Sequence, residues 1–267
     1  MSAPIRIEKR GVVDWVTFNR PDQLNALNDV MIDALCNYFG ALARDRATRV
    51  VVLRGAGRAF CAGLDLSAER GSMDTIDRLR QQRDIAEIVL RMRYCPQPII
   101  SLVQGPACGG GFAIALASDI RIAAESARMN AAFIRIGLSA CDIGVSYLLP
   151  RLVGASVAAE LMLTGDFIDA GRALNLGLVS RVVAEADLEA TALPLIDAML
   201  TTSPLGLRLT KEGLRMAIDS PSLEAAIALE DRNQVLCALS PDFAEGVAAF
   251  FEKRRPAYAS LVEAPNS

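Results

Sequence analysis

A run of three glycines, Gly109, Gly110 and Gly111, constrains the fold of this chain more than any other feature. It follows an apolar segment, 98–103, with the pattern of a buried strand, and it leads into the alanine-rich run 112–117, which we predict to be helical. Glycine costs roughly 1 kcal/mol per residue relative to alanine in a helix, so three at a helix start need a reason. A buried strand, a turn and a helix in this order predict an α/β architecture.

The same order repeats along the first half of the chain. Strands are predicted at 5–8, 12–18, 50–53, 98–103 and 120–123, and helices after Asn28 and over 74–93. Short, uniformly apolar strands predict a sheet covered on both faces. From Val145 onward the pattern is mostly helical. We therefore predict a core over residues 1–200 and a helical region over 201–267, whose segment 242–254 docks on the core or on a neighbouring subunit.

Charge and hydropathy exclude several classes of partner. The net charge is −3 and the isoelectric point about 5.2, which argues against a nucleic-acid surface and makes a membrane-surface role less favourable. The uncharged stretch 94–118 contains three prolines and four glycines, so we predict a buried strand, turn and helix rather than a membrane span. The N-terminus has no apolar signal core, which predicts a cytoplasmic protein.

The composition also limits the chemistry. The chain has no histidine, so neither a Ser-His-Asp nor a Cys-His arrangement can exist. Its six cysteines form no CxxC pair, which predicts reduced thiols and no metal site. Proton transfer in an enzyme of this composition falls to carboxylates, tyrosines, lysines or water.

The glycine run does not fit a phosphate-binding loop. The chain has no GxGxxG after its first strand, and no lysine follows Gly111 as a P-loop requires. An alternative is an oxyanion hole, in which backbone N–H groups from two turns stabilise a developing negative charge. The segment 62–64 (Ala-Gly-Leu) offers a second turn, in which the first two residues have small side chains or none. Close packing of helix on strand also favours glycine, and the glycines alone leave both interpretations open.

Several segments in chain order carry a family resemblance. They are Asn19–Pro21 with Leu24–Asn28, then 57–66, 104–111, 118–121, 163–166, 173–179 and 250–254. Together they resemble the crotonase superfamily, also called the enoyl-CoA hydratase/isomerase family, over nearly the whole chain.

The resemblance implies a fold and an assembly. The fold is a crotonase-like spiral of ββα units with a C-terminal helical trimerisation region. The assembly is a homotrimer or a dimer of trimers. Acyl-CoA thioesters would be the substrates, with coenzyme A part of the substrate and no separate cofactor.

The resemblance also implies site residues. The amides of Leu64 and Gly110 would hold the thioester oxygen. The substrate-binding residues would be Ala26, Ala62, Leu66 and Phe133, together with Phe250 and Lys253, which would reach the adenine and phosphates of coenzyme A from a neighbouring subunit.

The chain departs from the hydratase pattern at both catalytic glutamates. Those positions carry Ala113 and Phe133. Asp142 resembles an aspartate of dienoyl-CoA isomerases and some hydrolytic relatives, and we predict that it moves the proton. Its alternative role is a turn or N-cap residue for the next helix.

Other acidic and nucleophilic residues have structural interpretations. We expect Asp65 and Asp119 to hold turns. Asp84 and Glu87 belong on the solvated face of a charged helix rather than in the acyl pocket. Tyr147 and Cys141 are weaker candidates, which packing explains better than catalysis does.

Three reactions share such an oxyanion hole. We rank reversible hydration of a 2-enoyl-CoA first, enoyl or dienoyl isomerisation next, and thioester or C–C hydrolysis after them. A CoA-thioester-binding protein with little catalysis is the competing hypothesis from another class.

Overall fold

A single twisted sheet organises the core in the computed structural model, which describes residues 3–67 and 74–258. Its strand order is β1-β2-β3-β4-β6-β9, where β1 pairs antiparallel with β2 and every later neighbour is parallel. The strands are β1 (Ile5–Arg10), β2 (Val13–Phe18), β3 (Val50–Gly55), β4 (Ile99–Val103), β6 (Ile120–Ala124) and β9 (Arg181–Val183). The predicted strands are all present, and the α/β fold class is confirmed.

A smaller sheet and ten helices complete the described part of the chain. The small sheet pairs β5 (Ala107–Cys108), β7 (Arg128–Asn130) and β8 (Ile168–Asp169). The helices are α1 (Asp29–Leu42), α2 (Thr75–Tyr94), α3 (Gly110–Ala117), α4 (Val145–Val153), α5 (Ala155–Thr164), α6 (Ala170–Asn175), α7 (Leu188–Leu200), α8 (Pro204–Ala217), α9 (Leu223–Ala238) and α10 (Pro241–Glu252).

Local sequence explains where the first helices begin. The side chain of Asn28 accepts a hydrogen bond from Met31 N at the start of α1, and that of Asp74 accepts from Ile76 N and Asp77 N at the start of α2. Both caps satisfy backbone donors that have no partner inside the helix. Val30, in the first turn of α1, is 61% exposed, because the buried positions follow the row through Met31.

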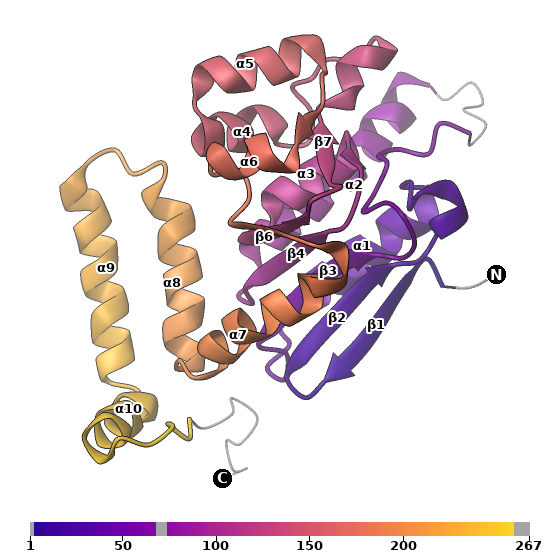
Figure 1. Cartoon of the computed structure of the whole chain (residues 1–267). Helices are drawn as coiled ribbons and strands as arrows, with labels where there is room; N and C mark the ends of the chain where they lie inside the picture. Colours follow the sequence, from indigo (N-terminus) through magenta and orange to yellow (C-terminus); the bar gives the residue numbers. More distant parts are fainter. Residues whose placement is uncertain (1–2, 68–73, 259–267) are drawn as a thin grey trace.

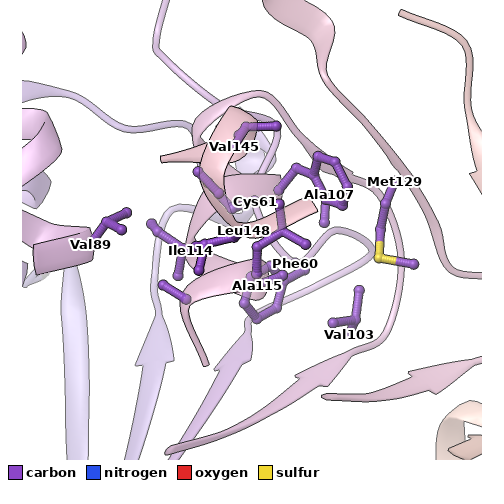
Figure 2. Close-up of a cluster of buried hydrophobic side chains, with 14 of the residues drawn as sticks. Phe60, Cys61, Val89, Val103, Ala107, Ile114, Ala115, Met129, Val145 and Leu148 are labelled. Carbon is purple, nitrogen blue, oxygen red and sulfur yellow. The ribbon is translucent and has the colours of Figure 1, made fainter. Parts of the chain in front are cut away.

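Both faces of the large sheet are covered by helices. On one face, Val52 and Leu102 pack with residues of α7 such as Ala192. The other face lies under α1 to α5. Figure 2 shows part of that larger core, where Val89 of α2, Ile114 of α3 and side chains of β7, α4 and the β4–β5 region converge on Phe60 and Cys61. This packing holds the start of α3 and the turn after β3 against one rigid core.

The uncharged stretch 94–118 is folded as the composition predicted. It contains β4, β5 and α3 in succession, and α3 is buried at every position. None of the helices in residues 3–67 and 74–258 is long and apolar enough to cross a bilayer.

The C-terminal helices stand apart from the core in Figure 1, where α8 and α9 run side by side and α10 lies at the end of this pair at which α8 follows α7. One buried lysine ties α8 to the core. Lys211 Nζ lies 2.9 Å from Asp119 Oδ2 and donates to the carbonyls of Met92 (3.1 Å) and Gln97 (2.7 Å). Asp119 also accepts from Ile99 N, so its expected structural role is confirmed. The predicted boundary at residue 200 lies in the link between α7 and α8, and the division into two units stays a prediction.

Candidate active site

Backbone hydrogen bonds hold the turn after β3 on two sides. On one side, Leu27 N donates to Gly63 O (2.7 Å) and Asp65 N donates to Leu27 O (2.9 Å). On the other side, Cys108 N donates to Cys61 O (2.9 Å). Because backbone bonds fix this turn at both ends, its amide directions do not depend on side-chain packing alone.

The glycines allow the two predicted turns to approach at backbone distance. A Cβ atom on Gly63 would lie 2.8 Å from Cys108 O and 3.5 Å from Gly110 N. A Cβ atom on Gly111 would lie 2.1 Å from Cys61 O, closer than any real contact. The close-packing interpretation of the glycines is therefore confirmed: α3 packs closely on the first turn, and this packing brings two backbone segments together at one site.

Two N–H groups are left free where the turns meet. Within residues 3–67 and 74–258, neither Leu64 N nor Gly110 N donates a hydrogen bond, whereas Gly109 N is used by Asn130 O (3.0 Å). Gly110 is the first residue of α3, so its amide stands at the positive end of a helix. Both residues line one cavity of about 110 Å³. Free amides aimed at a cavity are suited to an anionic oxygen.

Side chains of the segment 19–28 fix the backbone next to this cavity. Asn25 is fully buried, and its side chain accepts from Arg20 N (2.9 Å) and donates to the carbonyls of Ala56 (2.9 Å) and Ala59 (2.8 Å). The Arg20 guanidinium donates to Ala26 O and pairs with Asp65 Oδ2 at 2.8 Å. Asp65 thus holds a turn, as the sequence predicted. The side chains of Arg20, Asn25 and Asp65 fix the backbone beside the cavity and do not themselves line it.

Asp142 enters the same cavity from the loop before α4. Its Oδ1 accepts from Ile143 N (2.8 Å) and from Gln82 Nε2 (2.5 Å), the latter on α2. The N-cap of α4 is Gly144, which has no side-chain capping bond, and Val145 N donates to the Asp142 backbone carbonyl. The alternative role as a side-chain N-cap is therefore wrong, because the carboxylate points toward α2 and the cavity.

Burial raises the pKa of Asp142 above its ordinary value, while the hydrogen bonds from Ile143 N and Gln82 oppose that rise. Backbone strain accompanies the site. Ile143 has φ = +35°, a left-handed conformation that costs a β-branched residue about 1–3 kcal/mol. Such strain persists only where neighbours fix the backbone, and here Ile143 is buried against the cavity.

Apart from Asp142 and Gln82, the described side chains that line the cavity are apolar. Phe133 lies in this cavity, and its ring would be 3.5 Å from a Cβ atom added at Gly109. Ala113 is fully buried in α3 and does not reach the cavity. Among the described lining residues, Asp142 is the one titratable side chain. A single carboxylate therefore faces two free amides across apolar walls.

Nearby thiols do not compete as nucleophiles. Burial raises the pKa of Cys61 to about 12 and that of Cys108 to about 11, so both stay protonated at neutral pH. All six cysteines are free thiols, as predicted. Among the described residues, no group of three or more cysteine, aspartate and glutamate side chains could hold a metal ion.

The structure brings most of the predicted site residues together. Leu64, Gly110, Asp142, Ala62, Leu66 and Phe133 all line the cavity. Ala26 is buried and does not itself line the cavity, but it precedes Leu27, which does.

Phe250 lies elsewhere, on a cavity of about 870 Å³ between α8, α9 and α10, and Lys253 caps the end of α10. Within one chain, neither lines the Asp142 cavity, so their predicted contribution requires another subunit.

The other candidates lie outside the cavity. Glu87 pairs with Arg91 (2.8 Å) on the outer part of α2, and Asp84 is exposed, as the solvated-face interpretation predicted. Tyr147 hydrogen-bonds Asp219, and Cys141 is exposed.

Sequence reasoning missed two residues of α2 that line the cavity, Gln82 and Ile85. The helical period places Ile85 on the buried row with Ile88 and Met92. Gln82 stands one turn earlier at the edge of the same face, so the pattern gives the face but not the polar residue that meets Asp142.

Comparison with known proteins identifies the family of the chain. The family model described as enoyl-CoA hydratase/isomerase matches residues 8–261. The protein named "Probable enoyl-CoA hydratase echA12" of Mycobacterium bovis is 39% identical over 258 residues, covering 93% of this chain and 90% of that protein. The 1,2-epoxyphenylacetyl-CoA isomerase of Escherichia coli is 36% identical over 254 residues, covering 94% and 95%. The crystal structure of an enoyl-CoA hydratase from Bacillus anthracis superposes with a TM-score of 0.90 at 34% identity, covering 96% and 98%.

The chain belongs to the enoyl-CoA hydratase/isomerase family. It is a crotonase-family enzyme of hydratase/isomerase type, and the crotonase-like fold expected from its motifs is confirmed.

Proposed function

We propose that this enzyme moves a carbon–carbon double bond in an acyl-CoA thioester, with Asp142 as its one proton carrier. The observation that carries the proposal is the single titratable side chain in a cavity that also holds two free backbone amides. Coenzyme A enters as part of the substrate. The Escherichia coli relative is named 1,2-epoxyphenylacetyl-CoA isomerase, which supports an acyl-CoA thioester as the substrate and an isomerisation as the type of reaction.

Isomerisation needs only one acid–base group. The Asp142 carboxylate removes a proton from C2 of a 3-enoyl thioester, and the C–H electron pair moves toward the thioester carbonyl. Leu64 N–H and Gly110 N–H stabilise the negative charge on the oxygen of the resulting dienolate. The protonated Asp142 then returns the proton to C4, which leaves a 2-enoyl thioester and the original carboxylate.

Hydration is the second candidate, because several relatives carry the name hydratase. It requires a water oxygen to attack C3 and a proton to reach C2. Here Phe133 and Ala113 replace both glutamates, and the wall near Gly109 is apolar. We therefore propose isomerisation ahead of hydration, the reverse of the order that the sequence favoured.

A two-substrate assay tests this order. With trans-3-hexenoyl-CoA we expect the absorbance of a conjugated enoyl thioester to appear. With crotonyl-CoA we expect its loss to be slower, because no second acid positions water. Hydration of crotonyl-CoA without conversion of 3-hexenoyl-CoA would replace isomerisation by hydration. Tight binding of both thioesters without turnover would contradict both reactions and favour a binding protein.

The C-terminal helices supply the basis for an oligomer. Exposed apolar side chains gather there, including Leu214 (68%), Leu239 (81%), Phe250 (78%) and Phe251 (76%). An apolar surface of this extent on helices that stand apart from their own core suits a second copy of the chain. We propose a homotrimer or a dimer of trimers, in which Phe250 and Lys253 of one subunit face the coenzyme A bound along Ala26, Ala62 and Leu66 of the next.

Sedimentation velocity tests the assembly. At micromolar concentration we expect a mass three or six times the 28.6 kDa of one chain. Phe251→Asp should shift the protein toward smaller species, because it places a charge on the apolar surface. Val30→Asp is the matched control, an exposed apolar position on α1 of the core. A parent protein that sediments as a monomer would overturn the proposal.

A further inference from the structure

We infer that Gln82 is a positioning residue that fixes the Asp142 carboxylate, leaving its Oδ2 atom as the oxygen that carries the proton. This inference rests on the proposed function, since it refines how that carboxylate acts. Gln82 lies on α2 and Asp142 on the loop before α4, sixty residues apart in the chain. Their contact joins two separate elements at the cavity that both residues line.

The two carboxylate oxygens of Asp142 have different surroundings. Oδ1 accepts two hydrogen bonds, from Gln82 Nε2 at 2.5 Å and from Ile143 N at 2.8 Å. Oδ2 accepts none from residues 3–67 and 74–258. An oxygen held by two donors is less basic than one held by none, so the proton goes to Oδ2.

Gln82 has the chemistry that such a role needs. Its amide donates a hydrogen bond yet carries no charge and does not titrate. A lysine or arginine in its place would hold the carboxylate permanently ionised, which would weaken it as a base. The amide orients the group while leaving its proton exchangeable.

The other elements packed around Asp142 bring no competing charge. Leu64 and Leu66 come from the first turn, Gly110 from α3, and Phe133 and Ile136 from the η2 segment (Ala132–Ile136). Among the described lining residues, none of these or of α2 is charged. The ionisation of Asp142 therefore depends on burial and on its two hydrogen bonds, one of which the side chain of Gln82 supplies.

A matched pair of glutamines allows a sharp test. Gln81 is the neighbour of Gln82 on α2, and its Nε2 donates to Asp29 Oδ1 at 3.1 Å, outside the cavity. Gln82→Leu removes the donor to Asp142 at similar size, and Gln81→Leu removes an equivalent bond elsewhere on the same helix. Both glutamines lie on a solvent-accessible part of α2, so each variant is expected to fold.

The first readout needs no substrate. The carboxyl carbon of Asp142 is followed by ¹³C NMR titration of the full chain, with Asp142→Asn identifying the signal. We expect Gln82→Leu to raise the Asp142 pKa by about one unit, because a donor to the ionised form is lost. Gln82→Glu, which adds a like charge, should raise it further. Gln81→Leu should leave it unchanged.

The second readout is turnover of trans-3-hexenoyl-CoA. In Gln82→Leu the acidic limb of the kcat profile should move to higher pH by the same unit. The value of kcat should fall about tenfold at pH values below the new midpoint, with KM little changed. A merely structural Gln82 would alter stability without moving either midpoint.

Two results would overturn the inference: an Asp142 pKa that is equal in Gln82→Leu and the parent, or equal shifts in Gln81→Leu and Gln82→Leu. Different results would contradict the proposed reaction. If Asp142→Asn keeps full activity, or 3-hexenoyl-CoA is not turned over, the reaction is wrong, and the titration still decides whether Gln82 sets the pKa of Asp142.

Discussion

Replacing Asp142 by Asn is expected to lower kcat for 3-hexenoyl-CoA by at least 10² to 10⁴-fold, the usual contribution of a general acid–base group. The amide cannot accept the C2 proton, and no other titratable side chain among the described lining residues can take over. The oxyanion amides of Leu64 and Gly110 stay intact, so KM should change little. Steady-state kinetics on the parent and the variant measure both effects.

Glu87→Gln is the control for this substitution. Glu87 is also an acidic residue, and it lies on α2 close in sequence to the lining residue Ile85. It pairs with Arg91 at 2.8 Å and does not line the cavity. Its neutralisation should leave kcat within about twofold of the parent, as for most substitutions away from reacting atoms. A large loss in Glu87→Gln with full activity in Asp142→Asn would show that the wrong acid has been assigned.

Folding can be separated from chemistry in the Asp142 variant. Burial raises the pKa of this carboxyl in the folded protein, so the folded state binds its proton more tightly than the unfolded chain. The stability that it contributes is present at low pH and is lost as pH rises through the folded pKa. At pH 7 the neutral Asn removes this cost, and the melting temperature should equal or exceed that of the parent. An inactive variant with unchanged melting would therefore report on proton transfer alone.

Much of the fold follows from local patterns in the sequence. The strand 50–53 is uniformly apolar, and 98–103 is apolar except for the buried Ser101, because both are central in a sheet covered on both faces, and the structure places β3 and β4 there. Caps such as Asn28 and Asp74 mark helix starts through a single side chain. These signals lie within a few residues of the feature that they specify.

The site is less predictable, because its geometry joins distant segments. The glycine run predicted a close backbone approach, but the partner atom Cys108 O and the free N–H of Leu64 depend on tertiary pairing. The Gln82–Asp142 contact spans two elements without a shared periodicity, so no window of sequence contains it. The role that we propose for Phe250 requires a second subunit, so it does not follow from local patterns in one chain.

Gly63→Ala is expected to lower kcat/KM by 10² to 10³-fold, the cost of removing one oxyanion-hole donor. Gly63 has φ = +94°, and a Cβ atom there would lie 2.8 Å from Cys108 O. Residue 63 cannot shift freely to relieve this contact, because Leu27 N donates to its carbonyl oxygen at 2.7 Å. The first turn must therefore move away from α3, which separates the amides of Leu64 and Gly110.

Gly11→Ala is the matched control, because Gly11 also has a positive φ, +62°, but nothing lies within 4 Å of its added Cβ. It lies in the turn between β1 and β2, remote from the cavity, and should cost about 1–2 kcal/mol of stability with normal turnover. Gly63→Ala should cost more than this in chemical denaturation and should also lose activity. Equal effects of the two substitutions on stability, with normal turnover in both, would mean that backbone conformation alone explains Gly63. The close approach of the two turns would then have no part in catalysis.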